Sequence, residues 1–127
     1  MSLVVRAFPL RSSVAELHAF ASELTGARAA EAERFYRHYG ADHESWHLQQ
    51  TPNGPWVIAV TSLADPVEAA PRYAGATEAF HVWFKNQVLS LTGVDPNKAP
   101  LGPPTTQIFA WARHGDEPRA ASPAARP

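Results

Sequence analysis

The residues best suited to chemistry in this chain lie on one short stretch, residues 45–49. There the polar side chains of Ser45, His47 and Gln49 alternate with the apolar ones of Trp46 and Leu48. Because alternation with a period of two is typical of a β-strand, we expect the three polar side chains on one face of a sheet. An imidazole changes charge near neutral pH, so we predict His47 as a catalytic general base.

A cationic partner for His47 comes from the first apolar segment, residues 3–10, which we predict to be a strand closed by Pro9. Arg6 lies in this strand, and its guanidinium would hold a developing enolate or phenolate beside the base. We therefore predict Arg6 as the second catalytic residue. The alternative is that the polar side chains of this face only form hydrogen bonds across a dimer interface.

The walls of the predicted site come from the last apolar segment, residues 105–112, which we predict to be a strand. Gln107, Phe109 and Trp111 share one side of it. We predict that these three residues and Gln49 bind substrate, because aromatic walls with a few convergent polar groups are typical of small-molecule pockets. The expected ligand is a small, partly apolar organic molecule.

The segment from His43 to His47 also matches the zinc-binding pattern His-Glu-x-x-His. On a helix the two imidazoles lie one turn apart and bind one ion, and the intervening Glu44 activates a metal-bound water. Glu68 or His81 would then supply a third ligand. On a strand, however, His43 and His47 are about 13 Å apart and cannot share an ion. We prefer the strand and predict no metal and no cofactor, with a zinc-dependent hydrolase as an alternative.

A predicted β-hairpin positions these residues. Its strands, residues 44–50 and 55–62, flank the turn Pro52-Asn53-Gly54-Pro55. Asn-Gly accepts the positive φ that tight hairpin turns need, and the prolines stop either strand from continuing through the turn. A shift of one residue in the pairing would exchange the two faces, so the face that carries His47 depends on the register.

Capping and periodicity indicate helices on both sides of the hairpin. Ser13 and Glu16 have the spacing of a capping box, which begins a helix that Gly26 interrupts. A second helix runs over about residues 28–39 and ends at Gly40.

Two further helices precede the last predicted strand. Asp65 and Pro66 are typical of a helix start, and Pro71 keeps that helix short or kinked. The next helix begins at residue 77 or 78 and ends at residue 92. Its predicted buried stripe consists of Phe80, Trp83, Phe84, Val88 and Leu91, and its predicted outward residues are Glu78, His81, Lys85 and Asn86.

We interpret this order of elements as β-α-β-β-α-β. It is typical of an α+β, ferredoxin-like fold, in which a four-stranded antiparallel sheet carries its helices on one face. A chain of 127 residues is long enough for one such domain, which we place at residues 1–113. We predict an irregular loop at residues 95–104 and a disordered tail at residues 114–127, because neither has a periodic apolar pattern.

Both faces of the first and last predicted strands are apolar. On the first strand, Val4 and Phe8 oppose Leu3, Val5 and Ala7. A sheet that faces water on one side alternates between apolar and polar residues, and these strands do not. Packing of two sheets face to face would cover the second face, so we predict a homodimer.

The element order, the aromatic-rich hairpin strands and the closing strand resemble the dimeric α+β barrel superfamily. That superfamily includes antibiotic-biosynthesis-type monooxygenases and many uncharacterised small bacterial proteins. The resemblance covers about residues 3–112 and is one of fold pattern. It implies a small-molecule site in a cleft between sheet and helices or inside the barrel, and a monooxygenase-like, cofactor-independent oxygenase or an isomerase.

Composition limits the partners. The chain has 11 basic and 12 acidic residues, a net charge of −1 and no basic stripe, so we expect no nucleic-acid partner. It has no cysteine, which excludes disulfides and thiolate catalysis. We expect no membrane span and no signal peptide, and therefore a cytoplasmic protein. A non-catalytic assembly or ligand-binding module is the remaining alternative.

Overall fold

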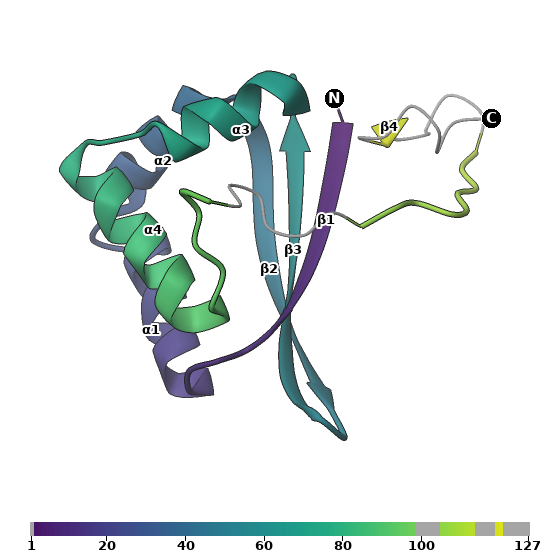
Figure 1. Ribbon diagram of the computed structural model, residues 1–127, viewed down its shortest axis with the longest axis horizontal. Coiled ribbons are helices and arrows are strands. Elements are labelled where there is room, and N and C mark those ends of the chain that lie inside the picture. Colours follow the sequence, from purple (N-terminus) through teal and green to yellow (C-terminus); the bar gives the residue numbers. More distant parts are fainter. Residues whose placement is uncertain (1, 99–104, 114–118, 121–127) are drawn as a thin grey trace.

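The structure is a computed structural model that describes residues 2–98, 105–113 and 119–120. Within this part of the chain, an antiparallel sheet of three long strands carries four helices on one face (Figure 1). The long elements are β1 (Ser2–Pro9), α1 (Val14–Thr25), α2 (Ala29–Tyr39), β2 (Ala41–Thr51), β3 (Gly54–Leu63), α3 (Pro66–Ala74) and α4 (Ala79–Thr92). This α+β architecture is loosely compatible with the predicted ferredoxin-like fold.

The predicted β-hairpin is confirmed. β2 and β3 pair antiparallel along their lengths, with an irregularity in the register between Ala41 and His43. Gly54 has a φ of 103°, a left-handed conformation that glycine adopts without strain. The Thr51 hydroxyl donates to the Gly54 carbonyl oxygen over 2.7 Å and accepts a hydrogen bond from the Asn53 amide. Local turn chemistry therefore fixes the register of the two strands.

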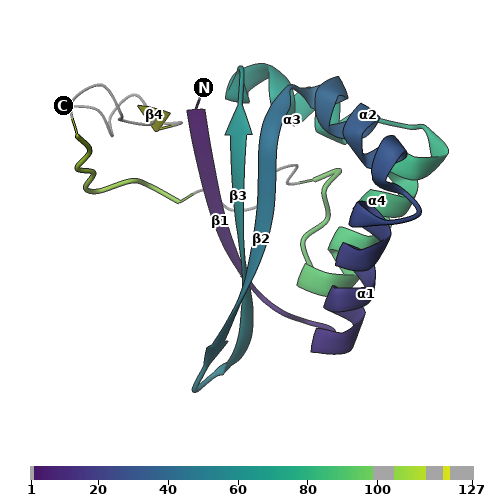
Figure 2. The same cartoon turned by 180° about the vertical axis from the view of Figure 1, so that it is seen from behind.

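β3 is the central strand. β1 pairs antiparallel with its other side, so that the order of the long strands is β2-β3-β1 and β2 is an edge strand. A strand of two residues, β4 (Arg119–Ala120), pairs parallel with the start of β1. Both views place all the helices on one side of the sheet, and residues 105–113 leave it on the other side (Figures 1 and 2).

The first two helices begin and end as predicted. The Ser13 hydroxyl accepts a hydrogen bond from the Glu16 amide over 3.1 Å, and the Glu16 carboxylate accepts one from the Ser13 amide over 3.3 Å, which confirms the capping box. At the end of α2, Gly40 has a φ of 85° and its amide donates to the carbonyl oxygens of Arg37 and Tyr36. Gly40 is thus the single residue that connects α2 to β2.

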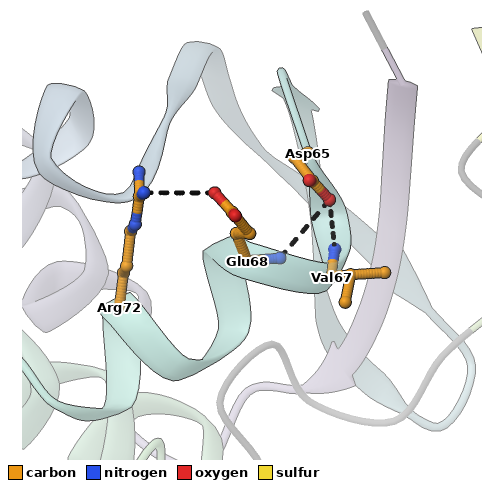
Figure 3. Close-up of polar contacts among 4 residues, drawn as sticks. All are labelled: Asp65, Val67, Glu68 and Arg72. Atoms are coloured by element: carbon orange, nitrogen blue, oxygen red, sulfur yellow. Dashed lines mark hydrogen bonds and ion pairs between the residues drawn. The ribbon is translucent and has the colours of Figure 1, made fainter.

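α3 confirms the predicted start at Asp65. The Asp65 carboxylate accepts hydrogen bonds from the amides of Val67 and Glu68 over 3.0 and 3.4 Å, and Glu68 pairs with Arg72 one turn later over 3.1 Å (Figure 3). Pro71 lies inside this helix, which is only 9 residues long. It is short, as predicted.

α4 buries most of the predicted apolar stripe, in which Trp83 is partly buried, and three further side chains, His81, Lys85 and Thr92. His81 and Lys85, which we predicted to face outward, are only 5% and 6% exposed. Lys85 is buried because Nζ donates to the carbonyl oxygens of Ala74 and Ala76 and to Oδ1 of Asn97. These acceptors come from the end of α3, from the α3–α4 connection and from the segment after α4, so the periodicity of the helix alone did not reveal them.

The core between the helices and the sheet is rich in aromatic rings. Phe35 is fully buried, and its ring centroid lies 4.7 Å from that of Phe84, 5.3 Å from that of Tyr39 and 5.5 Å from that of Tyr73. Tilted and edge-on contacts of this kind add to the stabilisation that comes from apolar burial. The helices are thereby held at a defined position over the sheet.

The prediction of a closing strand at residues 105–112 is wrong. This segment has no regular secondary structure, although the Thr105 hydroxyl donates a hydrogen bond to the Val5 carbonyl oxygen and so holds the start of the segment beside β1. Its alternating apolar residues resemble a strand, but strand preference depends on packing against a paired neighbour. A four-stranded antiparallel sheet is therefore not formed by the described residues.

Two predicted irregular segments lie largely outside the described residues. These are residues 99–104 of the predicted loop and the predicted tail, residues 114–127, of which only Arg119 and Ala120 are described. In the part of the chain that the structure describes, none of the helices has the length and apolar character needed to cross a membrane.

Candidate functional site

The strand register places the two predicted catalytic residues on opposite faces of the sheet. Arg6 lies opposite Ala59, which is 8% exposed and faces the helices. His47 lies opposite Ile58, which is adjacent to Ala59 in β3. Because successive residues of a strand point to opposite faces, His47 faces away from the helices. We call these the inner and the outer face. The prediction that His47 and Arg6 lie on the same face of the sheet is therefore wrong, and their catalytic roles stay predictions.

The other predicted site residues are not gathered around His47 either. Gln49 shares the outer face with His47, and the Ser45 hydroxyl lies 3.0 Å from Nε2 of His47. Phe109 and Trp111 belong to residues 105–113 and are each 80% exposed. An aromatic ring with that exposure is not a wall of a pocket, so the predicted binding site is not assembled in this chain. The individual roles of His47, Gln49 and Gln107 remain predictions.

The His43–His47 motif lies on strand β2, as predicted. His43 pairs with Ser62 and His47 with Ile58, both on the outer face, while Glu44 pairs with Thr61 on the inner face. The glutamate therefore points away from the two imidazoles, which are about 13 Å apart along the strand. Among the described residues, no group of three or more His, Cys, Asp or Glu side chains is arranged to hold a metal ion.

Glu44, which the sequence analysis considered only within the zinc alternative, is a candidate functional residue on the inner face. It points from edge strand β2 into the layer between the sheet and the helices. One carboxylate oxygen, Oε1, accepts hydrogen bonds from the Tyr39 hydroxyl over 2.9 Å and from the Thr61 hydroxyl over 3.1 Å. A sequence signal was present, since Glu44 has the same strand parity as the apolar Trp46 and Leu48. A carboxylate on the apolar face of a strand is unusual and marks a candidate site.

The environment of Glu44 favours its protonated form. Burial raises the pKa of the carboxyl above its usual range, while hydrogen bonds from Tyr39, Thr61, Tyr36 and Trp46 oppose that rise. The net direction is upward, so desolvation dominates. A carboxyl group with a raised pKa is a stronger base when it ionises, and it exchanges protons closer to neutral pH.

Three tyrosines surround this carboxyl. Burial, followed by the nearby negative charge of Glu44, raises the pKa values of Tyr36, Tyr39 and Tyr73 above their usual range. Their hydroxyls therefore keep their protons and serve as hydrogen-bond donors at neutral pH. A carboxylate beside neutral phenols combines a base with donors that can hold a developing oxyanion.

Two cavities meet at Tyr36 and Glu44. One has a volume of about 470 Å³, and its polar lining includes Glu33, Arg37 and Asp42. The other has a volume of about 420 Å³ and a more apolar lining, which includes Leu17, Phe20, Leu24, Trp46 and Leu48. We call these the polar and the apolar cavity, and together the cleft. The cleft lies between edge strand β2 and helices α1 and α2, and it has the volume of a small-molecule site.

Arg6 belongs to the same layer as Glu44. Both residues line a third cavity of about 50 Å³ between the sheet and α4, together with Thr61 and Tyr73. Burial lowers the pKa of Arg6 from its usual value. Arg6 therefore shares a cavity on the inner face with Glu44, whereas His47 lies on the outer face.

We compared the chain with protein-family models, curated proteins and solved structures. No protein-family model matches the chain, and neither the curated proteins nor the solved structures give a significant match.

Proposed function

We propose that this protein binds a small, partly apolar organic molecule in the cleft and transfers protons to and from it through Glu44. One observation carries the proposal: the Glu44 carboxyl, held by Tyr39 and Thr61, lies where the polar and the apolar cavity meet. The apolar cavity suits a ring or a short acyl chain. The polar cavity suits the functional group that reacts.

The reaction that fits these groups is isomerisation by proton transfer. Ionised Glu44 removes a proton from a carbon next to a carbonyl group, and the electrons of the C–H bond move to the carbonyl oxygen as an enolate. Tyr36 lines both cavities, and once Glu44 has taken up the proton the Tyr36 hydroxyl turns from Glu44 to donate its hydrogen bond to that oxygen. In a substrate with a C=C bond β,γ to that carbonyl, return of the same proton from Glu44 to the γ carbon re-forms the carbonyl, moves the C=C bond into conjugation and completes the isomerisation with no other reactant.

A cofactor-independent oxygenase shares the first of these steps. There the enolate or phenolate passes electrons to dioxygen, which must enter as a co-substrate. This is the activity that the resemblance to the dimeric α+β barrel superfamily implies, and the superfamily assignment itself is part of the proposal. Isomerisation needs fewer components, so we rank it first.

Two alternatives are ranked below it. A zinc hydrolase would need His43 and His47 on one turn of a helix, and they lie on a strand instead. A non-catalytic binding module would use the same cleft without proton transfer. Binding and catalysis therefore need separate tests.

Occupation of the cleft is tested with 1-naphthol, a small aromatic probe with an acidic hydroxyl, by isothermal titration calorimetry. Ala21 of α1 lines the apolar cavity, whereas Ala15 of the same helix does not belong to its lining. We expect Ala21→Phe to weaken binding by about tenfold or more because the added ring fills the cavity, and Ala15→Phe to leave binding unchanged. The absence of saturable binding, or equal affinities of the two variants, would contradict the proposed cleft.

Proton transfer is tested by the enolisation of benzoylacetone, whose enol absorbs in the ultraviolet. We expect Glu44→Gln to reduce the enzyme-dependent rate by about a hundredfold or more, as for the loss of a general base. His47→Ala is the matched control, because it removes a candidate base on the other face of the sheet. A rate that falls with His47→Ala and not with Glu44→Gln would replace the inner site with the outer one.

We further propose that the protein is a homodimer joined through the outer sheet face, as the two-sided strands of the sequence predict. Supporting this, the outward residues of β1 and β3 include Val5, Ile58 and Val60, and Val5 is 38% exposed. The cleft lies between β2 and helices α1 and α2, and His43 and Ser45 are the outer-face residues that also belong to its lining. Sedimentation velocity across a concentration series tests the dimer.

A further inference from the structure

Residues 105–113, which we call the arm, expose a group of large apolar side chains. Ile108 is 95% exposed, and Phe109 and Trp111 are each 80% exposed. The arm starts at β1, where the Thr105 hydroxyl donates a hydrogen bond to the Val5 carbonyl oxygen. It then runs outward from β1, away from the helices (Figure 2). Such a group of apolar side chains on one short segment is typical of a contact surface.

The outer sheet face has the composition of the centre of an interface. Its outward positions are Leu3, Val5, Ala7 and Pro9 on β1, Gly54, Trp56, Ile58, Val60 and Ser62 on β3, and His43, Ser45, His47, Gln49 and Thr51 on β2. None of these is Asp, Glu, Lys or Arg, although such residues make up 18% of the chain. Depletion of charge is the compositional mark of a buried interface centre.

We propose that the arm of each copy packs on the outer sheet face of a second copy of this chain. The arm does not cover its own sheet, as the exposure of Ile108, Phe109 and Trp111 shows. A two-fold dimer brings each arm to the partner's face and covers both apolar surfaces in one arrangement. The proposal rests on the proposed homodimer and concerns the face opposite to the cleft.

The size of the surface supports a role for the arm. The outer face offers 14 outward positions on the three long strands. A standard interface uses about 20–30 residues from each partner. The face alone falls short of this range, and the nine residues of the arm, numbers 105–113, bring the surface into it. The arm is thus the additional area that a stable dimer through this face needs.

Cross-linking between two singly substituted chains tests the arm directly. The natural chain contains no cysteine, so each introduced thiol is unique. Chains with Trp111→Cys are mixed with chains with Val60→Cys and oxidised, and a disulfide between different chains is then measured by mass spectrometry. An arm that folds back on its own sheet cannot give this product. Val67→Cys, at a residue of α3 that is 83% exposed, is the matched control partner.

We expect the Trp111–Val60 pair to form at least about tenfold more cross-linked product than the Trp111–Val67 pair, which measures random collision. We also expect Ile108→Asp with Trp111→Asp to raise the dimer dissociation constant by about tenfold or more in sedimentation experiments, because two buried apolar side chains are lost. Val67→Asp is the control and should leave it unchanged. The arm is exposed, so these variants should keep the thermal unfolding midpoint of the monomer.

Two results would overturn the proposal, and they are distinguishable. A protein that stays monomeric at all concentrations would contradict both the proposed dimer and the proposed exchange of arms. The second result is a dimer that gives no Trp111–Val60 cross-link and whose dissociation constant is unchanged by the arm substitutions. It would contradict the exchange of arms but not the dimer itself. Neither result bears on the cleft, which 1-naphthol and benzoylacetone test separately.

Discussion

The Tyr39 hydroxyl donates a hydrogen bond of 2.9 Å to Oε1 of Glu44, across the boundary between the helices and the sheet. Tyr39 belongs to α2 and is only 2% exposed, and Glu44 belongs to edge strand β2. The bond therefore joins the helical layer to the strand and also orients the carboxyl at the cleft. Because burial penalises the ionised carboxyl, the chemistry proposed for Glu44 carries a cost in stability.

Glu44→Gln is expected to stabilise the protein at alkaline pH. The pKa of Glu44 is raised above its usual value of 4.5 in the folded protein, so the folded state binds the proton more tightly than the unfolded state. The contribution of Glu44 to stability is thus greatest below pH 4.5 and decreases as the pH rises through the folded pKa. Glutamine keeps the shape and an acceptor oxygen but cannot ionise.

The measurement is thermal unfolding of both proteins between about pH 4.5 and pH 8. The unfolding midpoint of Glu44→Gln should exceed that of the natural protein at pH 8, and the difference should shrink toward pH 4.5. Glu33→Gln, at an exposed glutamate of α2 that pairs with Arg37, is the control for the loss of a surface carboxylate. A natural protein that is relatively more stable at pH 8 than the Gln variant would contradict the raised pKa.

Tyr39→Phe is expected to lower the free energy of unfolding by about 1.5–3 kcal/mol at a pH where Glu44 is ionised, the range for a hydrogen bond to a charged group. In a Glu44→Gln background the same substitution should cost only about 1 kcal/mol, because the acceptor is then neutral. Urea unfolding of the four proteins gives the coupling energy. Equal costs in both backgrounds would show that Tyr39 does not stabilise the ionised carboxyl.

Local signals in the sequence predicted much of the fold. The hairpin turn at Gly54, the capping box at Ser13 and the helix end at Gly40 each depend on a few neighbouring residues. Such features need no information about distant parts of the chain. The helices and the hairpin strands were therefore predicted close to their observed positions.

The site was predicted poorly because its geometry depends on contacts between distant segments. The parity of Arg6 with Val4 and Phe8 was visible in the sequence, but its face relative to His47 follows only from the pairing of β1 and β2 with β3. Residues 105–112 have a strand-like alternation, yet strand formation requires a pairing neighbour.

His81→Phe is expected to raise the free energy of unfolding by about 1 kcal/mol at pH 7, because it removes an unpaired buried nitrogen and keeps an aromatic ring. Within the described residues, Nδ1 of His81 is buried without a hydrogen-bond partner, and the ring centroid lies 4.8 Å from that of Phe35. Burial lowers the pKa of His81 below 6.5, the nearby Glu78 opposes this, and His38 and Lys85 add to it.

The pH dependence of this variant follows from the lowered pKa. The folded state binds the imidazole proton less tightly than the unfolded state, so stability is full above pH 6.5 and is lost as the pH falls through the folded pKa. The advantage of His81→Phe should thus be larger at pH 5 than at pH 7.5. Thermal unfolding at the two pH values measures it, and His18→Phe on the exposed part of α1 is the control. An advantage that shrinks at pH 5 would contradict this account.

Lys85→Met is expected to be the most destabilising of these substitutions, by about 2–4 kcal/mol. The Lys85 ammonium group donates hydrogen bonds of 2.9 and 2.7 Å to the carbonyl oxygens of Ala74 and Ala76 and one of 3.0 Å to Oδ1 of Asn97. Methionine has a similar volume but no donor, so these acceptors lose their partner. Asn97→Ala removes only one of the three bonds and should cost about 1 kcal/mol in urea unfolding. Equal losses of unfolding free energy for the two variants would mean that the carbonyl oxygens of Ala74 and Ala76 find other donors. Lys85 would then not hold the α3–α4 connection against residues 95–98.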